Sequence, residues 1–237
     1  MTSTGDELRQ PEHADRRRLI LATLWTLLCM VLLLFVPAGT LAWFKGWLFS
    51  VAIVVMMTPV SLYLRRVNPD VIAARVNRYE GTKSWDRVVV TILILVFVSI
   101  LPLAALDDGR FHWHPVPWWV CVIGYALLLL GTLGMTWAES VNKFFEPTVR
   151  IQTDRGHRVV DSGPYAIVRH PGYLAAWFLF LGMPLSLGSL WALIPAVLTC
   201  LILVVRTILE DRTLHNELAG YKEYAKRVRY RLVPGVW

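Results

Sequence analysis

Long apolar stretches constrain the fold of this chain more than any other feature of its sequence. Several of them exceed about 18 residues, the length that separates a membrane-spanning helix from a helix buried in a soluble core. Charged residues make up only 17% of the 237 residues, against about a quarter in an average soluble domain. The sequence therefore predicts an all-α polytopic membrane helix bundle with about five to six transmembrane helices. The expected spans are residues 19–38, 45–64, 88–106, 118–138, 172–187 and 190–209.

The basic residues are distributed very unevenly between the two sides of this predicted bundle. Four Lys and Arg lie in the N-terminal tail, six in residues 65–87, five in residues 140–171 and seven from Arg206 onward, whereas the opposite side carries Lys45 and Arg110. This bias follows the positive-inside rule and predicts that both termini are cytoplasmic. It also accounts for the net charge of +7 without a nucleic-acid partner. We expect a multi-pass protein of a bacterial inner membrane or an equivalent membrane, in contact with membrane lipids.

The chain divides into three predicted regions. Residues 1–18 are polar and mixed in charge, and are expected to form a disordered cytoplasmic tail. Residues 19–138 are expected to hold the N-terminal transmembrane helices, with a short helix near residues 69–80 that lies on the cytoplasmic membrane surface. Residues 139–237 contain most of the unusual polar residues and are expected to form the functional region.

Two motifs that can signal metal or disulfide chemistry are better explained by packing. Cys29, Cys121 and Cys200 all lie within predicted spans and have neither disulfide nor metal-ligand spacing. His112 and His114 form an H-x-H pair, but no third metal ligand follows within reach in the sequence. We therefore predict no metal site.

Small residues predict close packing and a sharp turn in the second half of the chain. Gly131 and Gly134, three residues apart in a span, suit close approach of two helices in lipid. Pro184, Gly188 and Ser189 predict a tight turn between the last two spans. These spans are expected to form a C-terminal helical hairpin that enters the membrane from the cytoplasmic face and returns to it.

Polar and chemically unusual residues gather in two blocks, residues 142–173 before this hairpin and residues 206–237 after it. Both blocks are cytoplasmic by the charge distribution. Because the hairpin brings their ends together, we expect a site at the cytoplasmic mouth of the bundle.

The second block contains ionisable residues at the boundary of a span. Arg206 and Glu210 are four residues apart and share one helix face. Ionisable groups at such a depth are candidates for function, although Arg206 can instead extend to lipid headgroups while it pairs with Glu210. Arg229 and Arg231 alternate with apolar residues near the C-terminus and are expected to contact headgroups.

The motif GPYAIVRHPGYL, which begins at Gly163, connects these blocks to a known group of enzymes. It is preceded by H-x-V-V and followed, after one helical hairpin, by E-D-x-x-L and Y-x-x-Y-x-x-x-V. This pattern resembles the isoprenylcysteine carboxyl methyltransferases and their wider superfamily of phospholipid and thiol membrane methyltransferases, over roughly the last hundred residues. The resemblance implies a membrane enzyme that uses S-adenosyl-L-methionine without a Rossmann domain and binds it in a cytoplasmic pocket.

The resemblance also implies roles for individual residues. Arg206 matches the arginine placed at the carboxylate of the acceptor and is the predicted catalytic residue. The usual pair of glutamates is Glu210-Asp211 here, and the stretch before Tyr221 is one residue shorter than usual. The residues that match cofactor-binding positions are Gln152, His157, Arg158, Val159, Val160, Tyr165, His170, Pro171, Gly172, Tyr173 and Glu210.

The leading hypothesis is an integral-membrane methyltransferase that transfers a methyl group from S-adenosylmethionine to a lipophilic small molecule or a lipidated acceptor. Arg206 favours a carboxylate acceptor such as a prenylcysteine, and a thiol or a phospholipid amine stays open. An NADPH-dependent sterol-type reductase is a further alternative, although such enzymes are expected to have more spans. A transporter or scaffold is ranked last, because the polar residues gather at one mouth of the bundle and not near the bilayer midplane.

Three substitutions express this hypothesis. We expect Glu210→Ala and His170→Ala to weaken cofactor binding, whereas Arg206→Ala should leave cofactor binding largely intact and reduce turnover. Calorimetric cofactor binding and methyl-transfer assays on the purified variants measure the two quantities separately. If all three variants keep wild-type binding and turnover, the site has been assigned to the wrong residues.

Overall fold

The computed structural model describes residues 9–74 and 81–237, and within these ranges the chain forms helices joined by loops, without strands. Four helical segments are long and apolar enough to cross a membrane, and two apolar helices are shorter. This confirms the predicted all-α polytopic bundle. The long segments are α3 (Phe44–Val67), the run Ser84–Phe111, α7 (Trp118–Val141) and α9 (Leu193–Glu217), and the shorter ones are Thr23–Ala38 within α2 (Arg9–Ala38) and α8 (Pro171–Ser186).

Large apolar side chains face outward along these helices. Trp25, Leu95 and Leu201 are each more than half exposed, and so are many of their apolar neighbours. In water, contiguous apolar surface of this extent would promote association. In a bilayer the surrounding solvent is hydrocarbon, so the same surface is favourable. The exposure pattern and the helix lengths together indicate an integral membrane protein.

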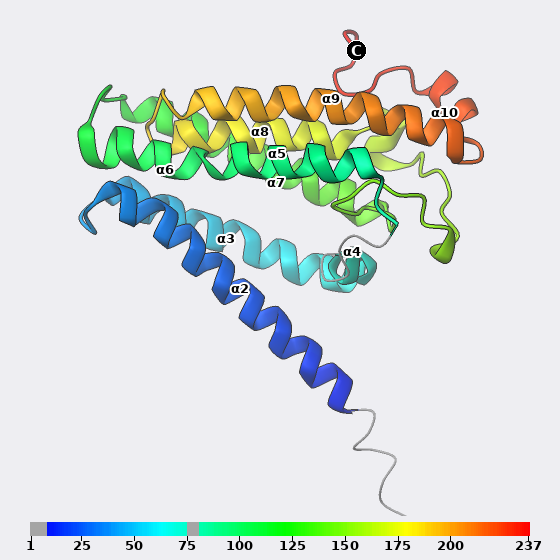
Figure 1. Cartoon of the computed structure of the whole chain (residues 1–237), viewed down its shortest axis with the longest axis horizontal. Helices are drawn as coiled ribbons and strands as arrows, with labels where there is room; N and C mark the ends of the chain where they lie inside the picture. Colours follow the sequence, from blue (N-terminus) through cyan, green and yellow to red (C-terminus); the bar gives the residue numbers. More distant parts are fainter. Residues whose placement is uncertain (1–8, 75–80) are drawn as a thin grey trace, which may run out of the picture.

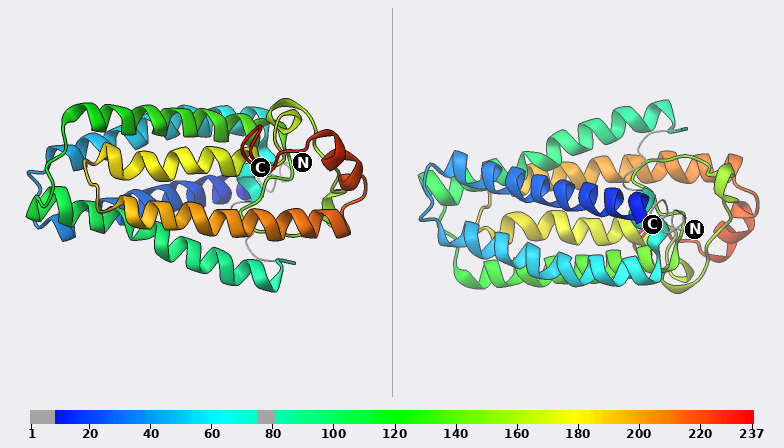
Figure 2. Two further views of the ribbon diagram at one scale, coloured as in Figure 1. Left: turned by 90° about the horizontal axis from the view of Figure 1, so that it is seen from above. Right: turned by 90° about the horizontal axis from the view of Figure 1, so that it is seen from below.

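The helices form a bundle with one loop-rich end. Helices α5 (Ser84–Val98), α7, α8 and α9 lie side by side, and α2 approaches them with its C-terminal part and diverges toward its N-terminus (Figure 1). Figure 2 shows the longer loops and α10 (Tyr221–Arg227) gathered beyond one end of the bundle. We call this the loop-rich end. It carries residues 142–170 and 218–237 and is the end predicted to be cytoplasmic.

The N-terminal helix begins earlier than the sequence analysis predicts. Helix α2 starts at Arg9, so residues 9–18 are helical and not part of a disordered tail; residues 1–8 of that predicted tail lie outside the described range. Helix propagation from an established span costs little per residue, whereas starting a helix is expensive. Pro11 falls in the first turn, where its missing N–H removes no helical hydrogen bond.

The third span is longer than predicted and changes its geometry near the end opposite the loops. Helix α5 is followed by α6 (Ile100–Ala104) and by a π-helical turn, η1 (Ala105–Phe111). The buried Asp107 in this turn accepts a hydrogen bond from the Ser189 hydroxyl at 2.6 Å. Its neighbour Asp108 forms an ion pair with Lys45 at 2.6 Å and accepts a hydrogen bond from Trp43 Nε1. These contacts fasten the connections at that end to one another.

The predicted C-terminal hairpin is present. Helix α8 ends at Ser186, Gly188 adopts a positive φ of 75°, and α9 begins at Leu193. Ser189 closes the turn by accepting the Ala192 N–H at 3.1 Å. Pro184 was expected in the turn, but it lies in the last helical turn of α8. The turn itself therefore depends on Gly188 and Ser189.

Glycines on α7 allow α8 to approach closely, as Gly131 and Gly134 predict. A Cβ atom at Gly131 would overlap Leu179 and the Ala175 carbonyl, both on α8. A Cβ atom at Gly124, further along the same face, would overlap the α8 backbone at Ser186. Small residues at a helix interface in lipid permit this kind of backbone contact.

The predicted surface helix near residues 69–80 begins as α4 (Pro69–Ala74), and residues 75–80 lie outside the described range.

The cysteines and His114 lie in packed surroundings. Cys121 and Cys200 are buried and unbridged within α7 and α9. His114 accepts a hydrogen bond from Trp191 Nε1 at 3.1 Å in the conformation shown. Among the described residues, no group of three His, Cys, Asp or Glu side chains is placed to hold a metal.

Substituting Gly124 tests the contact between α7 and α8. In Gly124→Ala the new methyl group meets helix backbone that cannot move independently, so we expect a loss of about 1–3 kcal/mol of stability. For a protein of this size that corresponds to a fall in Tm of roughly 3–10 °C, measured by thermal unfolding in detergent. Gly134→Ala is the control, because its Cβ would meet mainly the Ala175 methyl group at 3.2 Å. Equal Tm values for both variants would contradict this packing.

Candidate functional site

A cavity opens at the loop-rich end, between the loop of residues 142–160, the start of α8, the end of α9, and α10. About 810 Å³ of space not filled by protein atoms lies within it, including space open to solvent at its mouth. Ten of the eleven residues predicted to bind a cofactor line it. They are Gln152, His157, Arg158, Val159, Val160, Tyr165, His170, Gly172, Tyr173 and Glu210.

Two predicted residues do not line this cavity. Pro171 is buried at the first position of α8, where its fixed φ suits a helix start. Arg206 is also buried, one turn before Glu210 on α9, and its guanidinium is directed to other partners, described below. The structure thus brings the predicted cofactor residues together and places the predicted catalytic residue behind the cavity wall.

The loop of residues 142–160 forms one wall and is held by its own polar side chains. The Gln152 amide donates to the Phe144 carbonyl at 2.7 Å, and its oxygen accepts a bond from Arg155 at 2.8 Å. His157 accepts the Gln152 backbone N–H through Nδ1 at 3.3 Å. Burial lowers the pKa of His157, which favours the neutral imidazole that this acceptor role requires. The hydrogen bonds of Gln152 and His157 therefore fix the conformation of the loop that forms this wall.

Charged residues fasten this loop from outside. Arg150 forms ion pairs with Glu146 and Asp154, both at 2.8 Å, and the hydrogen bond that it donates to Glu146 is the main cause of its raised pKa. Arg155 reaches Asp70 on α4 at 3.1 Å. The loop is thus tied both to itself and to the short helix that follows the second span.

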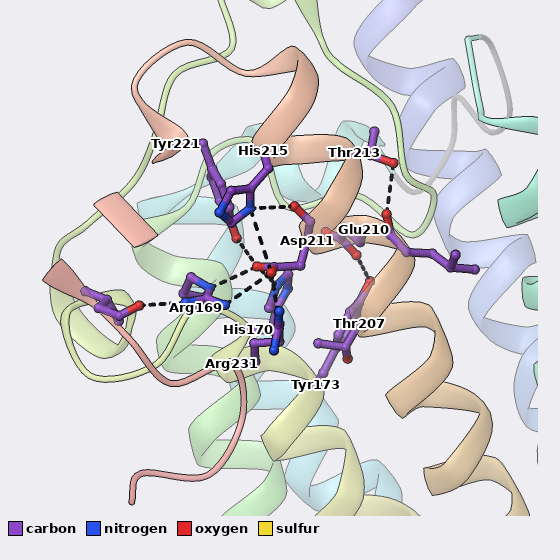
Figure 3. Close-up of polar contacts among 12 residues, drawn as sticks. Arg169, His170, Tyr173, Thr207, Glu210, Asp211, Thr213, His215, Tyr221 and Arg231 are labelled. Carbon is purple, nitrogen blue, oxygen red and sulfur yellow. Dashed lines mark hydrogen bonds and ion pairs between the residues drawn. The ribbon is translucent and has the colours of Figure 1, made fainter. Parts of the chain in front are cut away.

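The opposite side of the site is organised around one carboxylate, that of Asp211 on α9. Asp211 is 2% exposed and accepts bonds from Arg169 at 2.9 and 3.1 Å, from the Tyr221 hydroxyl at 2.8 Å and from Arg231 at 2.9 Å. The His170 ring nitrogen Nε2 lies 3.4 Å from the same carboxylate. Figure 3 shows these side chains converging on Asp211 from the residues just before α8, from α10 and from the C-terminal segment.

These bonds attach the C-terminal segment to the RHPGY motif. Arg169 donates through Nη1 to the carbonyls of Val228 and Arg229, both at 2.9 Å. The backbone N–H groups of Arg169 and His170 donate to the carbonyls of Tyr230 and Arg231. Arg231 was expected to contact headgroups, but its guanidinium instead binds Asp211. Arg229 is exposed.

Tyrosines complete the walls and stay protonated. Burial raises the pKa values of Tyr165, Tyr221 and Tyr224, so their hydroxyls remain donors at neutral pH. The Tyr224 hydroxyl donates to the Tyr165 carbonyl at 2.7 Å, which joins α10 to the loop before α8. The Tyr173 hydroxyl donates to Glu210, and its ring stacks on His170 with a centroid separation of 5.6 Å.

Arg206 is bound by a residue that the sequence analysis does not identify. Its Nε and Nη2 atoms donate to the fully buried carboxylate of Asp86 on α5 at 2.9 and 3.2 Å, and Nη2 also donates to the Pro147 carbonyl at 2.7 Å. The expected pairing of Arg206 with Glu210 is thus replaced by pairing with Asp86. A fully buried carboxylate requires such a partner, because an unpaired charge at this position would be strongly unfavourable.

Three residues of the site were not assigned a role from the sequence: Asp86, Arg169 and Asp211. Asp86 stands 120 positions from Arg206 in a different span, so no spacing rule connects them. Arg169 was noted in the motif but given no role, and Asp211 was noted only as the second acid of a pair. Asp211 itself was the available signal. It is a second carboxylate beside Glu210 near the end of an apolar helix, and such a group needs cationic partners.

The cavity offers a mixed set of binding groups. The Glu210 carboxylate can attract a cation, the exposed guanidinium of Arg158 can bind an anion, and the rings of Phe144 and Tyr173 can stack on a planar group. Gly172 has no side chain and lines the cavity with its backbone. Such a wall suits one zwitterionic ligand with a flat aromatic part.

Removing the charge of Asp211 tests its central position. In Asp211→Asn the buried Arg169 and the half-buried Arg231 lose their counter-ion, and we expect a loss of about 3 kcal/mol, or a fall in Tm of roughly 5–10 °C. Trypsin should also cleave more rapidly near Arg229. Asp161→Asn is the control, because Asp161 forms an exposed pair with Arg227 that is worth about 1 kcal/mol or less. Equal effects of the two substitutions would contradict the role given to Asp211.

Comparison with known proteins agrees with this site. Residues 119–219 match the family model described as phospholipid methyltransferase. The matched segment comprises α7, the loop of residues 142–160, α8 and α9. No curated protein matches the chain. The match supports a membrane methyltransferase and does not distinguish the isoprenylcysteine family within the superfamily. The predicted resemblance to the membrane methyltransferase superfamily is therefore confirmed at the level of this match over residues 119–219.

Proposed function

We propose that this protein transfers a methyl group from S-adenosylmethionine to a lipophilic acceptor whose reactive head reaches the cavity at the loop-rich end. The observation that carries this proposal is the gathering of ten predicted cofactor positions around one cavity within the matched domain. The proposal assigns the cavity to the methyl donor. It assigns the adjacent ends of the spans to the acceptor.

The groups on the cavity wall fit S-adenosylmethionine. This molecule carries a sulfonium, an amine, a carboxylate and an adenine. Glu210 would hold the cationic part, Arg158 would hold the carboxylate, and the ring of Tyr173 or Phe144 would lie against the adenine.

The protein would position the methyl donor next to the acceptor and exclude water from the reaction site. S-adenosylmethionine, when bound, supplies an electrophilic methyl group. Methyl transfer is an in-line displacement that requires the two reacting atoms to be about 3–3.5 Å apart with water excluded. Tyr173 and Glu210 line the cavity, and the Tyr173 ring also contacts the guanidinium of the buried Arg206, so this hydrogen-bonded pair is placed to separate the donor side from the acceptor side. The acceptor is itself the nucleophile: as its bond to the methyl carbon forms, the S–CH3 bond of the donor would break and S-adenosylhomocysteine would leave, and a thiol or amine acceptor would release its proton to solvent. The residues of the site would contribute binding and orientation.

The head group of the acceptor can be one of two chemical kinds. A carboxylate is already ionised at neutral pH, needs no general base, and could bind Arg206, as the resemblance implies. A thiol or an amine is the second candidate, and one observation favours it: Asp86 already occupies the Nε and Nη2 atoms of Arg206. In both cases the acceptor would enter from the lipid phase.

The two alternative functions are less well supported. A reductase would have to bind NADPH in the same cavity, whereas the family match supports methyl transfer. A transporter would be expected to have polar residues near the bilayer midplane, whereas the polar residues of this cavity are concentrated at the loop-rich end.

Direct binding separates these functions. We expect S-adenosylhomocysteine to bind the detergent-purified protein in the micromolar range and NADPH not to bind, by calorimetry with both ligands side by side. Glu210→Ala should weaken S-adenosylhomocysteine binding about tenfold or more, because it removes a charged hydrogen-bonding partner. Glu223→Ala, on the exposed face of α10, is the matched control and should bind normally.

Two results would contradict the proposed function. Binding of NADPH alone would assign the cavity to a reductase. Binding of neither ligand, in protein that unfolds cooperatively and contains acceptor lipid, would remove the support for an enzyme at this site.

A further inference from the structure

Asp86 has a place in the structure that the proposed function does not explain. It lies in the first turn of α5 and is fully buried. An acidic residue there can simply stabilise the start of a helix. Here, however, both carboxylate oxygens are bound by other elements: Oδ1 by Arg206 Nε at 2.9 Å, and Oδ2 by Arg206 Nη2 at 3.2 Å and by the Val149 N–H at 2.7 Å.

The ion pair occupies the edge of Arg206 that recognises carboxylates. A guanidinium binds a carboxylate most strongly through two parallel N–H groups, and Nε with Nη2 is one such pair. Nη2 is further engaged by the Pro147 carbonyl at 2.7 Å. The Tyr173 ring lies 5.4 Å from the guanidinium carbon on another side. An acid that approached Arg206 would have to compete with Asp86 or bind through the remaining Nη1 alone.

The charge around Arg206 also disfavours an anion. Asp86 balances the guanidinium, and Glu210 follows one turn later on the same helix, bound by the Tyr173 hydroxyl. An acid arriving here would meet two carboxylates and one guanidinium in a region of low dielectric constant, where charge interactions are strong. A thiol or an amine meets no such repulsion.

Asp86 also helps to position the wall of the cavity, because it binds the backbone of Val149. The Val149 N–H donates to Asp86, and its carbonyl accepts the Lys83 N–H at 3.1 Å, so this residue is bound on both sides by the segment that begins α5. Val149 and its neighbour Thr148 line the cavity. The Asp86 carboxylate therefore both balances the charge of Arg206 and holds Val149 in the cavity wall.

We propose that Asp86 is a specificity-determining residue, which pairs with Arg206 and thereby selects an acceptor with a neutral or cationic head, such as a thiol or an amine, over a carboxylic acid. This inference rests on the proposed function, because it takes Arg206 to face the acceptor. It narrows that function by assigning the chemical class of the acceptor and the residue that discriminates.

A matched pair of probes tests this inference. N-acetyl-S-farnesylcysteine is an acid, and its carboxamide has the same tail without the charge. The dissociation constants of both are measured for the detergent-purified wild type and for Asp86→Asn, each saturated with S-adenosylhomocysteine. We expect the wild type to bind the amide about tenfold more tightly than the acid, and Asp86→Asn to improve binding of the acid relative to the amide by about tenfold.

The control variant and the decisive outcomes are as follows. Asp161→Asn removes the same charge from an exposed pair at the loop-rich end and should leave the ratio of acid to amide affinity within twofold of the wild type. A wild type that prefers the acid overturns the inference, and so does an unchanged ratio in folded Asp86→Asn. If Asp86→Asn does not fold, the preference of the wild type decides alone. Failure of the wild type to bind S-adenosylhomocysteine would instead overturn the proposed function.

Discussion

The loop-rich end of this protein depends on the carboxylate of Asp211. Side chains from three separate parts of the chain bind or approach it: Arg169 with its neighbour His170, Tyr221, and Arg231. A buried charge is tolerated only when partners replace the water that it has lost, so these side chains can be fixed only together. The C-terminal segment, the RHPGY motif and α10 thereby become one rigid frame, and the cavity lies between this frame and the loop of residues 142–160.

Helix α9 distributes three charges within six residues, and each has a separate function in the structure. Arg206 pairs across the bundle with Asp86 on α5, Glu210 faces the cavity, and Asp211 holds the frame. These charges lie in the second half of α9, after an apolar first half whose residues face lipid or neighbouring helices. The arrangement places binding chemistry at the mouth of the bundle, where a lipophilic molecule in the bilayer and a polar molecule in water can meet.

Much of the fold was predictable from local patterns, and the ion pairs were not. Apolar length predicted the spans, Gly131 predicted the contact of α7 with α8, and the RHPGY resemblance predicted residues that do line one cavity. The Asp86–Arg206 pair joins positions 120 residues apart and leaves no periodic signal. Similarly, Arg231 in an alternating basic and apolar segment suits a headgroup contact equally well, and only the folded position of Asp211 decides between the two.

The central claim is that this cavity holds the methyl donor. The most direct measurement is an experimental structure of the detergent-solubilised protein with S-adenosylhomocysteine. The account predicts ligand density between Glu210 and Tyr173 on one side and the loop that contains His157 on the other, with the Asp86–Arg206 pair intact behind it. Density elsewhere on the protein, or an empty cavity at saturating ligand, would contradict it.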